Sequence, residues 1–390
     1  MKKRICFLTD SIFSIGGVQR VTAVVATALS ADYDVTIVTF DPPATADLTL
    51  YHLGETSISY RFFAYPKLSK VENTLCKAYS AFYQKVLPQS QWTSWLYGHS
   101  SFPPTLRRAL TRELKAGSYD VIIGVHAPLA GRLATIKSQL PGVKTIGWVH
   151  NSFEALFGAQ FRYIGAGRKR HYVYQFRRLD HVVLLCHHDA DMYQAYDPLF
   201  TPTVIYNPLT LTPGQRSDGT SKRFLAVGRF SRQHKGFDLL IEAFHLFAQH
   251  NSQWALDIVG EGREENLLRE LIRKYQLESR VTIHPFTTNI QQYYSQAQVY
   301  VLSSRWEGFG LVLVEAMAHG LPVVSSDLPT SLEIMGDFGL YFKNGDISAL
   351  AQQLEAATRL DWPSLSDEAL MIARRFDISH IIERWKALIG

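Results

Sequence analysis

Short runs of consecutive apolar residues alternate with segments of helical periodicity along almost the whole chain. The runs are continuously apolar, as in Arg4–Thr9 and Arg223–Val227, whereas half-buried strands alternate apolar and polar residues. Continuous runs are typical of parallel strands that helices cover on both faces. Their alternation with helical segments predicts an α/β fold built from doubly wound domains.

The predicted strands fall into two series, and 390 residues are enough for two domains of ordinary size. The first series comprises Arg4–Thr9, Asp34–Phe40, Asp120–Val125, Lys144–Val149 and His181–Cys186. The second comprises Arg223–Val227, Ala255–Val259, Arg280–His284, Val299–Ser303, Pro322–Ser325 and Leu340–Phe342. Helical periodicity is clearest in Val18–Leu29, Phe237–His250, Glu264–Tyr275 and Leu311–His319.

A polar, proline-containing stretch separates the two series and marks a linker near residues 205–221. We therefore expect an N-terminal domain over residues 1–205 and a C-terminal domain over residues 206–375. The last segment, residues 376–390, is predicted to be a helix that packs back on the N-terminal domain.

Charge and cysteine content exclude several classes of protein. The net charge of +5 is too small for a protein that coats nucleic acid, so no nucleic-acid partner is expected. Cys6, Cys76 and Cys186 show neither CxxC nor Cys/His ligand spacing, which argues against disulfides and structural zinc. No apolar run reaches the roughly 18 residues of a membrane span, and the N-terminal run is too short for a signal peptide. We expect a cytoplasmic protein without a cofactor.

One glycine-flanked loop carries two permanent cations. The strand Arg223–Val227 leads into Gly228 and Arg229, and Lys235 follows before a predicted helix. Ligands of open α/β sheets bind at the carboxyl ends of the strands, and helix N-termini attract anions. The loop therefore predicts a diphosphate site, although either cation alone could be an ordinary surface charge.

A second loop carries two carboxylates eight residues apart. Glu307 lies in a glycine-containing turn after the strand Val299–Ser303, and Glu315 lies about one turn into the following helix. Carboxylates repel a diphosphate but accept hydrogen bonds from hydroxyls, as acidic residues do with ribose. Taken singly, Glu307 could cap the turn and Glu315 could be a helix-surface charge.

Together these motifs resemble a known family. The strings GRF…KG, VGEG and EGFGLVLVEAMAHGLPVV are similar to the donor domain of the group 1 (family 4) retaining glycosyltransferases with the GT-B fold. The resemblance covers about residues 222–345, with the Glu-x7-Glu spacing as its signature, and is weaker at Gly16-Gly17 and His126. Pro285 stands where such chains usually have glycine. Residues 60–115 and 151–178 match no motif.

The resemblance implies two Rossmann-like domains that face each other across a cleft, and it implies roles for matching residues. Arg229 and Lys235 would bind the diphosphate, Glu307 the transferred sugar and Glu315 the ribose. Other donor-binding positions would be Gly16, Gly17, Gly228, Glu261, Phe286, Gly308, Phe309, Gly310 and Leu311. His126 would meet the sugar near its reacting carbon. The alternative for His126 is a hydrogen-bonded histidine that only packs at a strand end.

Two further polar clusters receive other interpretations. His150 ends a strand, and it could line the acceptor side or simply pack. The Asp189-x-Asp191 pattern resembles a metal-binding D-x-D, but it follows Cys186 at a predicted helix start, where aspartates favour the helix dipole. We prefer the helix-start interpretation and expect no metal site.

The resulting functional hypothesis is a retaining, metal-independent glycosyltransferase. It would move a sugar from a nucleotide sugar, with a UDP-sugar as first choice, to a glycan or lipid-linked acceptor in cell-envelope polysaccharide or lipopolysaccharide synthesis. A nucleotide-sugar isomerase or hydrolase and a non-catalytic two-lobed sugar-binding protein are the alternatives. A nicotinamide dehydrogenase is excluded because the turn at residues 14–19 lacks GxGxxG.

The segment Phe161–Arg178 interleaves aromatic and cationic residues. It is either a solvated helix whose aromatic rings pack inward or a surface that meets lipid headgroups or a phosphorylated acceptor. From the second interpretation we expect reversible contact with an anionic membrane, on the inner face of the cytoplasmic membrane.

Overall fold

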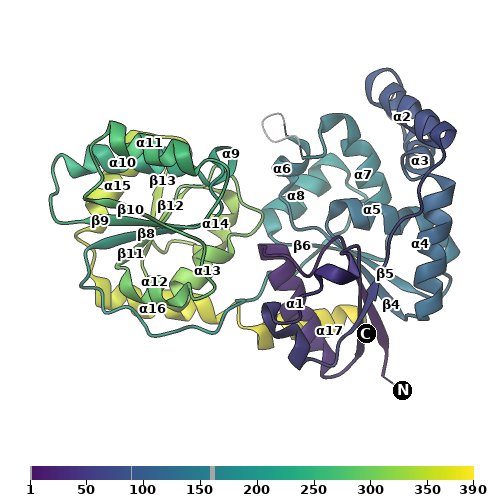
Figure 1. The fold of residues 1–390 in the computed structure, drawn as a ribbon, viewed down its shortest axis with the longest axis horizontal. Coiled ribbons are helices and arrows are strands. Elements are labelled where there is room, and N and C mark those ends of the chain that lie inside the picture. The colour runs from purple at the N-terminus through teal and green to yellow at the C-terminus, as the bar shows by residue number, and fades with distance from the viewer. Residues whose placement is uncertain (1, 89, 159–162) are drawn as a thin grey trace. The chain divides into compact units, whose positions relative to one another are not determined.

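The structure, a computed structural model, describes residues 2–88, 90–158 and 163–390. It divides into two compact units: residues 1–208 with residues 378–390, and residues 209–377. Each unit contains one parallel sheet flanked by helices (Figure 1). The predicted α/β class with two doubly wound domains is confirmed, while the cleft between the domains stays a prediction.

The first unit, as far as it is described, holds a seven-stranded parallel sheet in the order β3-β2-β1-β4-β5-β6-β7. Its strands are β1 (Arg4–Thr9), β2 (Asp34–Thr39), β3 (Ser59–Phe62), β4 (Val121–Val125), β5 (Lys144–Trp148), β6 (His181–Leu184) and β7 (Thr203–Val204). The sequence predicts all of them except β3 and β7. These two are the edge strands, and β3 is largely exposed, so neither needs a long apolar run.

Helices of the first unit flank the sheet, and several short 3₁₀ turns join them. The helices are α1 (Gly17–Ser30), α2 (Lys70–Lys85), α3 (Gln91–Ser101), α4 (Pro104–Gly117), α5 (Ala127–Ile136), α6 (Phe153–Phe157), α7 (Lys169–Phe176), α8 (His187–Tyr196) and α17 (Ile378–Ile389). The 3₁₀ turns are η1 (Pro43–Thr45), η2 (Leu50–Glu55), η3 (Lys137–Gln139) and η4 (Ala166–Arg168). Across the described residues, no helix combines the length and hydropathy needed to cross a bilayer.

The last helix, α17, belongs to the first unit although it follows the second unit in sequence. It packs beside α1, as Figure 1 shows. Trp385 is fully buried, and its ring meets that of Trp148 on β5 at a centroid distance of 4.8 Å. Lys144 Nζ donates to the carbonyl oxygens of Leu388 and Ile389, where a cation complements the helix dipole. Aromatic burial and this end contact hold α17 in place.

The second unit, described over its whole length, holds a six-stranded parallel sheet in the order β10-β9-β8-β11-β12-β13. Its strands are β8 (Arg223–Val227), β9 (Ala255–Val259), β10 (Val281–His284), β11 (Val299–Leu302), β12 (Val323–Ser326) and β13 (Leu340–Phe342), all of which the sequence predicts. Its helices are α9 (Arg232–Lys235), α10 (Phe237–Ala248), α11 (Glu265–Lys274), α12 (Gln291–Gln296), α13 (Leu311–Ala318), α14 (Pro329–Met335), α15 (Ile347–Ala357) and α16 (Trp362–Arg374).

Strand order reverses once near the middle of each sheet. In the first sheet β1 lies between β2 and β4, and in the second β8 lies between β9 and β11. The loops that follow β1 and β4, or β8 and β11, therefore leave their sheet in opposite directions. Open α/β sheets bind ligands at such switch points. Each unit thus has one position where a ligand site is expected.

Candidate active site

The loop after β8 lies at the switch point of the second sheet and presents the two predicted cations. The Arg229 side chain is exposed and makes no hydrogen bond or ion pair with any described residue. Lys235 ends α9 and is mostly buried. Gly236 follows with φ 63°, and a Cβ there would clash with the carbonyl oxygen of Ser303 beyond β11. Glycine therefore lets the two switch-point loops touch.

Lys235 and Glu307, the residue predicted to bind the sugar, form an ion pair across this switch point. Lys235 Nζ lies 2.7 Å from Glu307 Oε1, which also accepts a hydrogen bond from Ser304 Oγ. His234 Nε2 lies 3.5 Å from the other oxygen, Oε2. Burial raises the pKa of Glu307, but Lys235 and His234 outweigh it and hold that pKa far below its usual range. Glu307 is therefore an ionised acceptor.

The sequence analysis missed the pair formed by His234 and Trp306. Their rings stack with centroids 4.0 Å apart and planes inclined by 13°. Each residue precedes a predicted site residue in sequence, and that adjacency is the only local signal. The stack joins the β8 and β11 loops beside the Lys235–Glu307 ion pair.

Glu315 lies in α13, as predicted, but its side chain is buried. Its Oε2 accepts a hydrogen bond from the hydroxyl of Tyr294 on α12 at 2.9 Å. The His319 ring stacks on that of Tyr294. Nε2 of His319 accepts a hydrogen bond from the backbone N–H of Gly214. Contact of Glu315 with a ribose stays a prediction. The carboxylate would have to accept a ribose hydroxyl beside the Tyr294 hydroxyl, or in its place.

The remaining predicted donor-binding positions of the second unit follow neighbouring strands at the same edge. The exposed Glu261 follows β9, and its carbonyl oxygen accepts the N–H of Phe230 at 2.7 Å. Phe286 follows β10 and is more than one-third exposed. The β8, β9 and β10 loops thus form a row, in which Gly228 begins the first loop.

The start of α13 supplies backbone groups, not side chains, to the β11 loop. Gly310 precedes the helix with φ 88°, and no side chain caps the helix there. Phe309 is buried and packs edge-on against Phe376, so only its backbone could face a ligand. Gly308 and Leu311 flank this turn and are partly exposed.

In the first unit, Gly16 and Gly17 lie where β1 passes into α1. The Tyr51 hydroxyl donates to the carbonyl oxygen of Ser14 at 2.9 Å and accepts the Gly16 N–H at 3.0 Å. Sequence analysis did not single out Tyr51, which lies in the 3₁₀ turn η2. No side chain caps α1. Tyr51 therefore fixes the predicted close-approach loop.

His126 joins β4 to α5 with an unusual backbone, since its φ is 72°. Such a conformation costs a non-glycine residue on the order of 1–3 kcal/mol and is often kept at functional sites. Its Nδ1 is buried and lacks a hydrogen-bond partner among the described residues. The sugar contact of His126 and its alternative, packing at the strand end, both stay predictions.

His150, at the end of β5, lies beside His126 with ring centroids 5.4 Å apart. Its Nε2 is also buried without a partner in the described part of the chain. Burial lowers the pKa of both histidines, most strongly that of His150, whereas the charge of Asp10 partly opposes the shift at His126. The switch point of the first sheet therefore carries the neutral imidazole of His126, and the neutral ring of His150 lies beside it.

The D-x-D pattern lies at the start of α8, as predicted. Asp189 is in the first turn, and its Oδ1 accepts the backbone N–H of Phe153 at 2.9 Å. Within residues 2–88, 90–158 and 163–390, His, Cys, Asp and Glu form no cluster of metal-ligand type.

The segment Phe161–Arg178 begins outside the described residues, but α7 and its surroundings are described. The Phe176 ring is fully buried, and Tyr172 packs on Phe157 and Phe176. Lys169 Nζ lies 4.6 Å above the ring centroid of Tyr196. Tyr163, in contrast, is 63% exposed, so the rings of this segment divide between the interior and the surface, and neither interpretation is decided.

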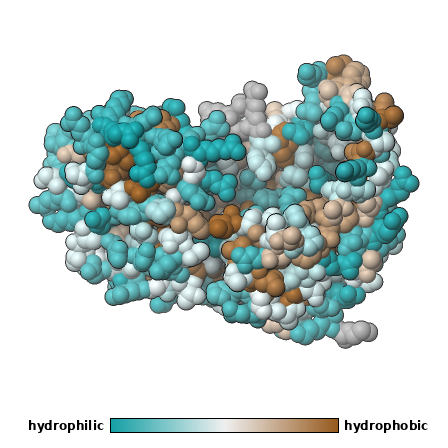
Figure 2. Space-filling view, in the orientation of Figure 1, coloured by the Kyte–Doolittle hydropathy of each residue, from teal (hydrophilic) through white to brown (hydrophobic). Residues whose placement is uncertain are grey.

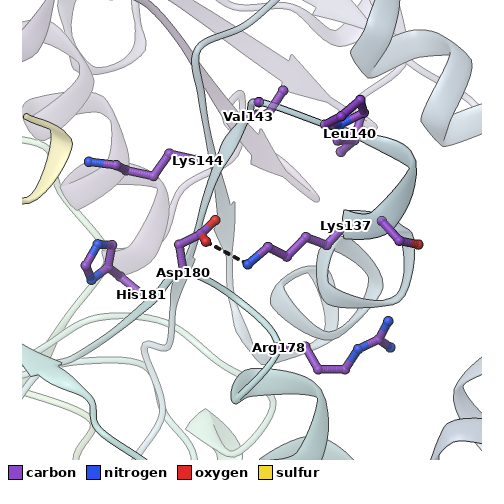
Figure 3. A pocket seen from close by; sticks show the side chains of 10 residues that line it. Lys137, Leu140, Val143, Lys144, Arg178, Asp180 and His181 are labelled. Carbon is purple, nitrogen blue, oxygen red and sulfur yellow. Dashed lines mark hydrogen bonds and ion pairs between the residues drawn. The ribbon is translucent and has the colours of Figure 1, made fainter.

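A large open pocket of about 810 Å³ lies elsewhere in the first unit (Figure 3). It is lined by residues that begin strands, including Lys144 of β5 and His181 of β6. Its Lys137 and Asp180 pair at 2.7 Å. The pocket is thus at the amino edge of the sheet, opposite the switch point, and contains none of the predicted site residues.

Comparison with known proteins adds relatives that cover most or all of the chain. An uncharacterised glycosyltransferase of Haemophilus influenzae is 26% identical over 99% of this chain and 100% of its own length. The amylovoran biosynthesis glycosyltransferase AmsD of Erwinia amylovora is 28% identical over 69% of this chain and 75% of its own. The structure of Anabaena Alr3699/HepE in complex with UDP matches with a TM-score of 0.76 and 21% identity, covering 99% of each chain.

Two protein families match in succession along the chain. Residues 15–212 match the family described as Glycosyltransferase Family 4, and residues 211–367 match Glycosyl transferases group 1. The first match alone spans half of the chain. The chain therefore belongs to the group 1 (family 4) glycosyltransferases.

Proposed function

We propose that this glycosyltransferase uses a nucleotide-sugar donor, with a UDP-sugar as first choice, and transfers the sugar with retention and without a metal ion. The observation that carries the proposal is the switch point of the second sheet, where Lys235 pairs with Glu307 near the exposed Arg229. The complex of Anabaena HepE with UDP, and another with UDP-glucose, support the choice of nucleotide.

Arg229 and Lys235 would stabilise the diphosphate as it leaves. An ammonium has three N–H donors, so Lys235 can hold Glu307 and a phosphate oxygen at the same time. Negative charge grows on the leaving oxygen, and cations already in place lower the energy of that state. Because these two side chains supply the charge, the proposal requires no metal ion.

Glu307 would accept hydrogen bonds from hydroxyls of the sugar. Its lowered pKa keeps it ionised at neutral pH, so it acts as an acceptor and not as an acid. The bond between the sugar carbon and the phosphate oxygen breaks, and a bond to the acceptor oxygen forms on the same face. The acceptor proton passes to the departing phosphate oxygen, so no carboxylate nucleophile is needed.

His126 would meet the sugar from the first unit. Its neutral ring and orphaned Nδ1 suit a hydrogen bond to a sugar hydroxyl. For the acceptor we propose a glycan or lipid-linked glycan of the cell envelope, which the relationship to an amylovoran biosynthesis enzyme supports.

A two-step experiment tests the proposal. Thermal shift with a panel of UDP- and GDP-sugars identifies the donor, because a ligand at a hundredfold excess over Kd adds roughly 2.7 kcal/mol of stability. Transfer is then assayed with that donor, with and without a chelator, and the product anomer is determined by NMR. We expect retention and full activity in the chelator. An inverted anomer would contradict retention, and loss of activity in the chelator would contradict metal independence.

The same assay distinguishes the alternatives. Free sugar formed without an acceptor would indicate a hydrolase, and an altered nucleotide sugar would indicate an isomerase. Stabilisation by a sugar with no product under any condition would indicate a binding protein.

A further inference from the structure

An unusual apolar surface covers α2 and α3 of the first unit, outside the candidate active site. On α2 and at its end, Val71, Leu75, Phe82 and Val86 are 70%, 65%, 48% and 64% exposed. Their spacing of four, seven and four residues places them on one face of the helix. On α3, Trp92 and Trp95 are 69% and 41% exposed. We call these six side chains the α2–α3 surface, and Figure 2 shows hydrophobic residues gathered over α2.

The opposite side of the helix pair explains how this surface is held outward. Tyr83 is the one buried side chain of α2; its ring stacks on Tyr97 of α3, and its hydroxyl contacts Ser94 Oγ. On α3 the buried residues are Thr93, Ser94, Tyr97 and Gly98, which leaves both tryptophans on the outward face. Helix α3 in turn packs on α7. The exposed residues therefore make no contribution to the core of the unit.

Cations flank the apolar stripe. Lys67, Lys70, Lys77 and Lys85 are all exposed. The one acidic residue between positions 63 and 103 is Glu72, and its carboxylate is hydrogen-bonded to Thr105. The α2–α3 surface, an apolar stripe with two tryptophans, is thus accompanied by four positive charges.

We propose that the α2–α3 surface docks on an anionic lipid bilayer, with α2 lying in the headgroup layer. Amphipathic helices with lysines beside an apolar face bind in this way, and tryptophan favours the membrane interface. Burial of exposed apolar groups supplies affinity, and anionic headgroups neutralise the lysines. Pairing with a second copy is disfavoured because a two-fold contact would bring like charges together.

The proposal replaces Phe161–Arg178 with α2 and α3 as the membrane-binding element. It concerns binding alone, so its failure would leave the proposed sugar transfer standing. If both hold, docking would bring the enzyme to lipid-linked acceptors.

Vesicle co-sedimentation tests the surface directly. The full chain is mixed with phosphatidylcholine vesicles with and without phosphatidylglycerol, at low and high salt. We expect binding to the anionic vesicles at low salt, weaker binding at high salt, and little binding to phosphatidylcholine alone. No binding to anionic vesicles at low salt would overturn the proposal.

Two variants separate the apolar and charged contributions. The combined change Val71→Ser, Leu75→Ser and Phe82→Ser should lower the partition coefficient by about tenfold or more. The combined change Lys70→Gln, Lys77→Gln and Lys85→Gln should lower it about fivefold per lysine at low salt. Because the three apolar side chains and the three lysines that are replaced are all exposed, both variants should fold, and circular dichroism checks this.

Matched controls locate the effect on the chain. Leu199→Ser with Met371→Ser removes exposed apolar residues elsewhere, and Arg168→Gln, Lys169→Gln and Arg170→Gln removes three other cations. Both controls should bind like the native chain. Equal loss in the cation control, or native binding by the serine variant, would refute the assignment to α2 and α3. A dimer in sedimentation velocity that the serine variant abolishes would assign the surface to a second copy instead.

Discussion

The two sheets share the order 3-2-1-4-5-6 around their switch points, yet the two switch points differ in chemistry. In the second sheet the loops carry Arg229, Lys235 and Glu307, two cations and a carboxylate of strongly lowered pKa. In the first sheet they carry glycines and His126, a neutral imidazole on a strained backbone.

This difference indicates a division of labour. Permanent charges suit a charged ligand such as a diphosphate, whereas neutral donors and acceptors suit sugar hydroxyls. If the comparison is right, changes in the second unit should affect nucleotide affinity, and changes in the first should affect transfer alone.

The largest effect is expected from Lys235→Ala. The change removes a cation that stabilises the leaving group and also deprives the buried Glu307 of its nearest cationic partner, so kcat should fall about 10²–10³-fold and nucleotide binding should weaken. Arg229→Ala should lower kcat too, but with less effect on stability, because Arg229 pairs with no described residue. Steady-state kinetics and calorimetry measure both.

Lys274→Ala, an exposed lysine of α11, is the matched control and should behave like the native enzyme. Near-normal turnover of either switch-point variant at saturating donor would mean that its cation does not stabilise the leaving group.

His126→Ala tests the first unit. We expect transfer to fall by about 10²-fold or more while nucleotide affinity stays near the native value, because the ring would contact the sugar and not the nucleotide. Calorimetry with the nucleotide and a transfer assay give the two numbers, and circular dichroism confirms folding. Parallel loss of nucleotide affinity in a folded variant would break the proposed division.

Glu307→Gln and Glu315→Gln sharpen the comparison within the second unit. Glu307 lies in the loop assigned to the sugar, so its change should weaken use of the nucleotide sugar more than binding of the bare nucleotide. Glu315 is assigned to the ribose, so Glu315→Gln should weaken both the use of the nucleotide sugar and the binding of the bare nucleotide. Titration with the nucleotide alone decides, since equal losses in the two variants would remove the distinction.

The smallest effect concerns stability and pH. The folded-state pKa of His150 is lowered, so between that value and its ordinary value of 6.5 the unfolded chain binds more protons than the folded one. Stability is therefore complete above about pH 6.5 and falls as the pH drops, by up to about 1.4 kcal/mol per pH unit for this group. Urea unfolding from pH 7 to 5.5 should show a shallower fall for His150→Phe.

His250→Gln, an exposed histidine of the second unit, should keep the native slope. An unchanged slope in His150→Phe would show that His150 does not contribute to the acid sensitivity.

Much of the fold was predictable because its signals are local. Buried parallel strands require continuous apolar runs, and eleven of them lie within two residues of their predicted ends. Strands β3 and β7 were missed because edge strands need less burial, and α2 because its apolar face is turned outward. Residues 60–115 accordingly gave no readable pattern.

The candidate site divides in the same way. Loop motifs around Arg229, Lys235 and Glu307 were visible because glycines, cations and carboxylates occur close together in sequence. Tyr51, Trp306 and Tyr294 were not, since each acts through contacts with residues distant in the chain or through a stack without a motif.

The sequence by itself determined the α/β class, the strand–helix alternation and the position of Glu315 in a helix eight residues after Glu307. Only the tertiary structure decided that Lys235 meets Glu307, 72 residues away, because that contact depends on β8 lying beside β11. It also decided the strained backbone of His126 and the docking of α17 on the first unit. Periodicity and propensity act within a few residues, whereas strand order and burial depend on how the whole chain packs.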